Sequence, residues 1–192
     1  LGVNAIGLLA MALDKLPLSS EVAARIHFIA DKIGLDGTGA GLGIALHDAP
    51  SGPLSFNLGT IQGDANGFTV RLNYRYPVTF SYDDCAPACT RAFAEAGFAK
   101  SNESHKPCLY MPEDCELVKT LLEVYAQETG QPAKAKSIGG GTYAKAIPNV
   151  VAFGPIFPGD EVREHKPDEF IEVDRLMQNV HLCAQALYQL AK

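Results

Sequence analysis

Residues 54–76 read LSFNLGTIQGDANGFTVRLNYRY, and this stretch predicts a β-hairpin. Residues 54–62 form the first strand candidate, and residues 63–67 are rich in types that favour turns. The return strand alternates strictly, which places apolar and polar side chains on opposite faces. The apolar set is Phe68, Val70, Leu72, Tyr74 and Tyr76, and the polar set is Thr69, Arg71, Asn73 and Arg75. We therefore expect one face of the hairpin to cover a core.

Helical patterns flank the hairpin on both sides. Before it, two apolar stripes precede Pro17 and Gly34, where helices are expected to end. After it, residues 82–96 predict a helix that is closed by Gly97. The two stripes are Ile6, Leu9, Ala10 and Leu13, then Val22, Ile26, Ile29 and Ile33. The first part of the chain is therefore predicted to be helix, helix, hairpin, helix.

The second part also mixes predicted helices and strands. Short strands are expected at 107–111, 135–138 and 149–153, and helices after Pro112 and over 173–190. The helical stripes are Leu117, Val118, Leu121, Leu122 and Tyr125, then Leu176, Val180, Cys183, Ala184 and Leu187. A short polar stretch at 101–104 separates the two parts. The sequence therefore predicts an α/β protein with domains at 1–103 and 104–192.

Composition and charge restrict the partners. The 192 residues carry a formal net charge of -6 and contain no run of Lys or Arg, whereas nucleic-acid binding needs clustered cations. No apolar stretch approaches the ~20 residues that span a bilayer. We expect no nucleic-acid partner, no membrane partner and a cytoplasmic location. The number of cysteines is odd and their spacing is irregular, which favours buried thiols in a reducing compartment. They are Cys85, Cys89, Cys108, Cys115 and Cys183.

His165 is the first candidate for chemistry. It lies near the end of a predicted strand, in the run EHKPDEF at 164–170. A neutral imidazole there could bind a metal, with nearby carboxylates fixing its tautomer. The alternative is a surface histidine in a charged loop, because zinc needs three or four ligands.

A glycine run supplies the second candidate. Gly139, Gly140, Gly141 and Thr142 lie between a predicted strand and a short helix. Consecutive glycines let backbone N–H groups approach an anion, and a helix N-terminus would add its dipole. A substrate carboxylate or phosphate would suit such a loop. The alternative is a tight turn.

Arg75 is the third candidate. It lies on the polar face of the hairpin, just before Pro77. The guanidinium group binds carboxylates through two parallel hydrogen bonds. The alternative is a solvated strand face that Arg75 shares with Arg71.

These signals occur in an order that resembles the carboxy-terminal segment of the peptidase V type of dipeptidase. The resemblance rests on GGGTYA at 139–144, VAFGP at 151–155, His165 with PDEF at 167–170, and ALYQL at 186–190. Earlier, GVNAI at 2–6 resembles the start of a lid helix, and NYRYP at 73–77 resembles the end of a lid hairpin. This group belongs to the superfamily of co-catalytic zinc amidohydrolases.

The resemblance implies a fold and roles for the candidate residues. Residues 1–103 would be part of an α/β lid, and residues 104–192 the carboxy-terminal part of an α/β zinc-peptidase catalytic domain. Arg75 would bind the terminal carboxylate of a dipeptide, and Gly140, Gly141 and Thr142 would hold the substrate from the other side. His165 would be the last ligand of one of two zinc ions, with manganese as the alternative metal.

The same resemblance implies that this chain is one piece of a dipeptidase. The family's other metal ligands and its general base lie upstream of the lid, so no catalytic residue is expected here. The chain also lacks an initiator Met and opens inside a helical pattern. We expect it to be inactive without the upstream half, and to expose apolar surface where that half packs or where the chain oligomerises.

Two other functions fit the sequence less directly. A deacylase of the same superfamily would hydrolyse N-acyl amino acids, and the GGGTY run at 139–143 argues against it only through resemblance. A non-enzymatic α/β binding or oligomerisation module is the third reading. Stoichiometric metal would favour an enzyme, and metal-free dimers would favour the module.

Overall fold

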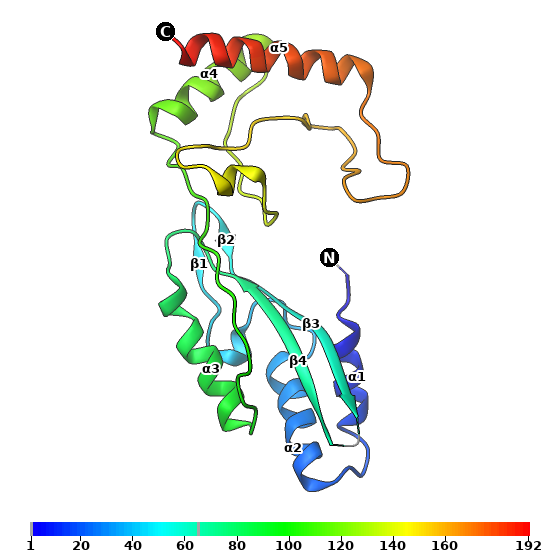
Figure 1. The fold of residues 1–192 in the computed structure, drawn as a ribbon. Helices are drawn as coiled ribbons and strands as arrows, with labels where there is room; N and C mark the ends of the chain where they lie inside the picture. Colours follow the sequence, from blue (N-terminus) through cyan, green and yellow to red (C-terminus); the bar gives the residue numbers. More distant parts are fainter. Residues whose placement is uncertain (1, 65) are drawn as a thin grey trace. The chain divides into compact units, whose positions relative to one another are not determined.

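The computed structural model describes residues 2–64 and 66–192. The chain divides into two compact units, Leu1–Cys108 and Leu109–Lys192 (Figure 1). The division lies a few residues after the predicted boundary at 103. Both units contain helices, and the first also contains small antiparallel sheets. The predicted α/β class is confirmed.

Two helical segments begin the first unit. Helix α1 (Ala5–Leu13) is capped by Asn4, whose Oδ1 accepts the N–H groups of Ile6 and Gly7 at 3.0 and 3.1 Å. Helix α2 (Ser20–Phe28) begins after Ser19 and continues as a π-helical segment, Ile29–Ile33. Gly34 then ends it with a φ of 49°, as the sequence predicts.

The predicted hairpin is present. Strand β3 (Ser55–Asp64) pairs antiparallel with β4 (Gly67–Arg75), with a bulge between Leu58 and Thr60. Along β4 the exposed polar residues alternate with half-buried apolar residues, as predicted. A second, two-stranded sheet, which the sequence analysis missed, leads into β3 and consists of β1 (His47–Asp48) and β2 (Gly52–Pro53).

The core of the first unit lies between the helices and the inner face of the hairpin (Figure 1). A 3-10 turn (Tyr82–Asp84) precedes helix α3 (Ala86–Glu95), and Gly97 follows it with a φ of 81°. A short 3-10 turn at Ala40–Leu42 completes the unit. The side chains that are almost fully buried are Ile29, Ile44, Leu54, Leu58 and Cys85. The prediction of buried thiols holds for Cys85 and Cys89 but is wrong for Cys183, which is exposed.

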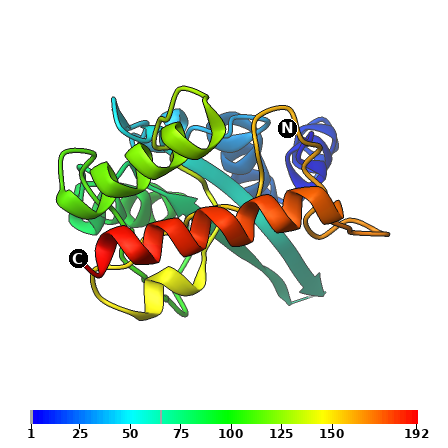
Figure 2. The same cartoon turned by 90° about the horizontal axis from the view of Figure 1, so that it is seen from above.

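The second unit is built on two helices. Helix α4 (Glu116–Thr129) ends at Gly130, which has a φ of 65°. Helix α5 (Val173–Leu190) lies beside α4 (Figures 1 and 2). Between them the backbone is irregular apart from a 3-10 turn at Tyr143–Ala146. The core cluster consists of Leu121, Val124, Phe157, Leu182 and Ala186.

Three predicted strands are wrong. Residues 107–111, 135–138 and 149–153 all have irregular backbone. Each is a short apolar run of the kind that forms a strand only beside another strand. Within the described part of the second unit, residues 109–192, no strand is present to pair with them. The preference of these runs for strand structure therefore does not lead to strands.

The predicted apolar stripe of α5 is also wrong, although the bounds of the helix agree. The side chains that pack inward are Asn179, Leu182 and Ala186. Leu176, Val180, Cys183, Ala184 and Leu187 are all exposed. The helix therefore carries a narrow buried stripe and a wider apolar face that no other part of the described second unit, residues 109–192, covers. Among the described residues, no helix is long and apolar enough to cross a membrane.

Candidate functional site

Arg75 is the last residue of β4 and lies opposite Ser55 in the antiparallel register. Because Tyr74 and Tyr76 pack against the core on either side of it, the alternation of the strand directs Arg75 outward. Arg75 is exposed, and its guanidinium group forms no ion pair with any residue that the structure describes. An arginine in this state can bind an external anion without first breaking an internal bond.

The outward face of the hairpin is polar and carries positive charge. Arg71 occupies the same face as Arg75, and Asn73 lies between them. Asn73 is opposite Asn57 in the register, and Asn57 Oδ1 accepts a hydrogen bond from Asn4 Nδ2 at 3.1 Å. Arg75 thus adds its guanidinium group to a face that also carries amide donors, and these are the groups that recognise carboxylates.

Gly140, Gly141 and Thr142 lie in an exposed bend of the second unit. A side-chain carbon added at Gly141 would meet no atom within 4 Å, and one added at Gly140 would only touch Ile138 Cδ1 at 3.9 Å. The segment is therefore open to its surroundings, and its described backbone is a bend for which no turn hydrogen bond is found. The helix that follows is a single 3-10 turn, Tyr143–Ala146. The prediction that a helix dipole contributes here is therefore wrong, because the dipole depends on many aligned peptide units and this turn has only a few.

His165 lies in a turn and not at the end of a strand, which corrects the sequence prediction. Its backbone has a φ of 63°, a left-handed conformation that is uncommon for residues other than glycine. Its N–H donates to Glu169 Oε2 at 3.3 Å. The loop is further held by Lys166 Nζ, which donates to the carbonyl of Val162 at 2.6 Å. The imidazole itself is exposed and available to a ligand.

The candidate residues fall into both units. Arg75 belongs to the first, and Gly140, Gly141, Thr142 and His165 belong to the second. Within the described part of the second unit, no hydrogen bond joins His165 to Gly140, Gly141 or Thr142.

A metal site needs more ligands than this chain gathers. No group of three or more His, Cys, Asp or Glu side chains that could hold a metal ion occurs among the described residues. One exposed imidazole fills one coordination position, whereas zinc takes three or four protein ligands. The residues present therefore do not fit a complete zinc site, and any site that includes His165 needs ligands from elsewhere.

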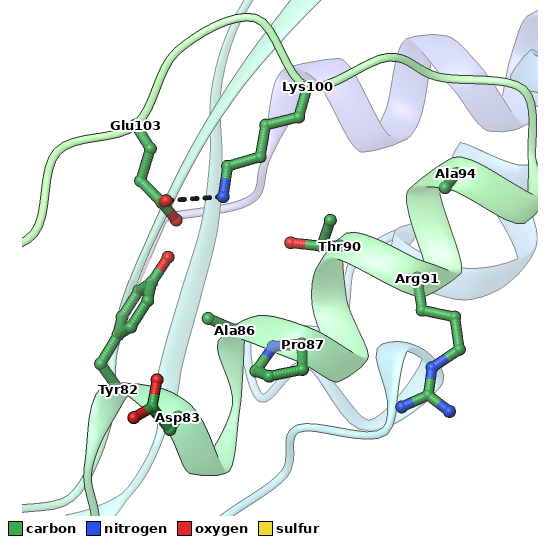
Figure 3. A pocket seen from close by; sticks show the side chains of 9 residues that line it. All are labelled: Tyr82, Asp83, Ala86, Pro87, Thr90, Arg91, Ala94, Lys100 and Glu103. Carbon is green, nitrogen blue, oxygen red and sulfur yellow. Dashed lines mark hydrogen bonds and ion pairs between the residues drawn. The ribbon is translucent and has the colours of Figure 1, made fainter.

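The first unit also has an open hollow of about 380 Å3 along α3. Figure 3 shows the Lys100–Glu103 ion pair on the side of the hollow that faces α3, with Tyr82 pointing toward Glu103 and Thr90 pointing inward. The ion pair is 2.6 Å long and is partly exposed. None of the predicted site residues lines this hollow.

Asp48 is the residue that sequence reasoning overlooked. It is only 8% exposed, and its carboxylate accepts hydrogen bonds from Ser51 and Thr79. The available signal was the run DAPSG at 48–52, because Asp followed by Pro, Ser and Gly is turn chemistry in which the carboxylate bonds to nearby backbone. His105 is a second residue that the sequence analysis did not single out, and its Nε2 lies 2.8 Å from Tyr76 Oη in a hydrogen bond.

The chain is similar along its whole length to proteins named dipeptidases. It is 38% identical over 193 residues to "Putative dipeptidase YtjP" of Bacillus subtilis (strain 168). It is 31% identical over 192 residues to the Beta-Ala-Xaa dipeptidase of Lactobacillus delbrueckii subsp. lactis. Each alignment covers 100% of this chain and 41% of the relative, so the chain spans less than half the length of these curated relatives. No family model matches the chain.

Proposed function

Since this chain resembles the carboxy-terminal part of a peptidase V type dipeptidase, we propose that the whole protein is a metal-dependent dipeptidase that hydrolyses unblocked dipeptides. The observation that carries the proposal is the similarity to named dipeptidases over 100% of the chain. The proposal takes the whole protein as the active species and residues 1–192 alone as inactive, which the 41% coverage of the relatives supports.

Arg75 binds the free carboxylate of the dipeptide in this proposal. Its exposure, its freedom from ion pairs among the described residues and the neighbouring amide donors all support that role. A dipeptidase must distinguish a short unblocked substrate from a longer chain, and a free carboxylate one residue beyond the scissile bond is one of the groups that mark it. The bidentate geometry of arginine suits that group better than a lysine would.

The second unit supplies the remaining contacts. Gly140, Gly141 and Thr142 offer exposed backbone N–H groups to the substrate, and the open space at Gly141 leaves room for it. His165 provides one ligand to a zinc or manganese ion whose other ligands come from the rest of the protein. The exposed imidazole and the left-handed backbone of the turn support this role.

The apolar face of α5 is covered by the rest of the protein. That face carries Val173, Leu176, Met177, Val180 and Leu187, which are 46–72% exposed. Large exposed apolar patches are rare on proteins that stand alone and mark contact surfaces. The proposed covering partner is the remaining length of the same polypeptide, and the 41% coverage of the relatives supports it. A second copy of the chain is the alternative occupant.

Metal analysis and hydrolysis of an unblocked dipeptide, measured on the intact protein, test the proposal. We expect about two metal ions per chain, turnover of the dipeptide, and no turnover by residues 1–192 alone. His165→Ala should lose metal and reduce turnover by about 100-fold or more. His47→Ala is the matched control, since His47 is an exposed histidine of the first unit, and should behave as wild type.

Two outcomes would contradict the proposal. An intact protein that binds no metal and cleaves no dipeptide removes both the activity and the assignment of His165. Faster hydrolysis of N-acyl amino acids than of dipeptides identifies a deacylase instead.

A further inference from the structure

The buried carboxylate of Asp48 ties together the two backbone segments that flank Arg75. Asp48 Oδ1 accepts hydrogen bonds from the N–H and the hydroxyl of Ser51 at 2.7 and 2.8 Å. Asp48 Oδ2 accepts from the N–H and the hydroxyl of Thr79 at 2.9 and 3.0 Å. Ser51 Oγ in turn accepts the N–H of Val78 at 3.0 Å. One side chain thus closes a bond network between the β1–β2 turn and residues 78–79.

This network holds two backbone segments near Arg75: the one that leads into its partner strand β3, and the one that follows Arg75 in the chain. On one side, β2 leads through Leu54 into β3, where Ser55 is the partner of Arg75 in the register. On the other side, Arg75 continues through the buried Pro77 to Val78 and Thr79. Because Asp48 binds both continuations, it fixes the end of β4 where an open sheet would otherwise fray.

The next residue is held as well. Tyr76 Oη is hydrogen-bonded to His105 Nε2 at 2.8 Å, and the Tyr76 carbonyl accepts a bond from Cys108 Sγ at 3.6 Å. Burial raises the pKa of Tyr76, so the phenol keeps its proton. Tyr76 therefore holds the end of β4 independently of the Asp48 network. A change at Asp48 should then shift Arg75 without unfolding the first unit.

We propose that Asp48 is a positioning residue that sets Arg75 for recognition of the substrate carboxylate. This inference rests on the proposed role of Arg75. The precision that a bidentate guanidinium–carboxylate contact needs is high, and such contacts depend on a supporting shell of hydrogen bonds. The Asp48 carboxylate is charged when it acts: burial alone raises its pKa, but hydrogen bonds from Thr79 and Ser51 outweigh this and lower the pKa to about 2.

The experiment compares two substrates on the intact protein, a dipeptide and the same dipeptide with a C-terminal amide. The quantity measured is the ratio of their kcat/KM values. Arg75→Ala should lower this ratio about 100-fold, because only the free carboxylate uses the guanidinium. Asp48→Asn should lower it about 10-fold through KM, with little change for the amide. In the Arg75→Ala background, Asp48→Asn should have no further effect on the ratio.

Two matched variants accompany the test. Arg71→Ala removes the other arginine of the same strand face and should leave the ratio unchanged. Ser51→Ala removes only the hydroxyl that joins Asp48 to Val78, and should lower the ratio in the same direction if Asp48→Asn does not fold.

Each result decides the inference. If Arg75→Ala lowers the ratio but Asp48→Asn and Ser51→Ala do not, or reduce both substrates equally, Asp48 does not position Arg75 while the proposed role of Arg75 stands. If Arg75→Ala leaves the ratio unchanged, the proposed role of Arg75 fails and the inference falls with it.

Discussion

The two units differ in whether each element finds its partner within the chain. In the first unit β3 pairs with β4, and the apolar face of the hairpin packs on the core with the helices. In the second unit α4 packs on α5, but the short apolar runs at 135–138 and 149–153 remain irregular and α5 exposes most of its apolar face. A local preference becomes structure only where its partner is within reach.

The same difference separates the candidate residues. Arg75 is placed by a strand register and a buried carboxylate network. His165 and the glycine segment at 139–141 lie in exposed loops that are held mainly by bonds within themselves. If the rest of the protein packs on the second unit, the loops of that unit should become more ordered in the intact protein than in residues 1–192 alone. The first unit should change far less.

The largest expected effect is on the packing of the first unit. In Gly7→Ala the new methyl group would overlap the carbonyl oxygen of Gly34. Backbone cannot move away cheaply, so we expect a loss of about 3 kcal/mol. Hydrogen exchange followed by peptide mass spectrometry should show lost protection across α1 and α2, with α4 and α5 unchanged.

Gly2→Ala is the control for that variant, because a side-chain carbon at Gly2 would meet nothing within 4 Å. It should match wild type. Equal loss of protection in α4 and α5 would show that the two units unfold together, which would break the comparison.

The next effect separates the two faces of α5. Leu182 is 3% exposed and belongs to the core of the second unit, whereas Leu187 is 69% exposed. In residues 1–192 alone, Leu182→Ala should cost about 2 kcal/mol, and Leu187→Ala less than about 0.5 kcal/mol. Urea denaturation followed by the far-UV signal measures both.

In the intact protein the result for Leu187 should change. If the remaining polypeptide covers the outer face of α5, Leu187→Ala should become destabilising by about 2 kcal/mol. The same small cost in both forms would show that this face stays exposed.

The smallest expected effect is the loss of the Asp48 contribution to stability at acidic pH. Because the folded pKa of Asp48 is lowered from 3.8 to about 2, the charged carboxylate stabilises the first unit above about pH 4. This contribution is lost as the pH falls through about 2. The stability difference between wild type and Asp48→Asn should therefore be constant above pH 4 and shrink below it.

Urea midpoints between pH 2 and pH 6 measure that difference. The lowered pKa values of Asp31, Asp36 and Asp84 are common to both proteins and cancel. A difference that does not depend on pH would show that the Asp48 network acts without the charge.

Much of the first unit could be predicted because its signals are local and agree. The alternation in β4, the turn residues before it and the glycines that end α2 and α3 each specify a backbone state within a few residues. Arg75 could be named as a candidate for the same reason, since the strand period alone places it on the outer face.

The parts that could not be predicted depend on distant residues. The role of Asp48 arises from contact with Thr79, which is 31 positions away. The inward face of α5 is set by α4 and Phe157, and it includes the polar Asn179, whose Nδ2 donates to the Pro155 carbonyl at 2.8 Å. No hydrophobic pattern along α5 would select that face.

The sequence by itself determined the hairpin, the bounds of α5, the apolar alternation and the resemblance to dipeptidases, because periodicity and turn chemistry act over a few neighbouring residues. Only the tertiary structure decided which face of α5 is buried, that the short apolar runs are not strands, and that one buried carboxylate fixes the end of β4. Those outcomes depend on pairing and desolvation between segments far apart in the chain, which no local pattern encodes.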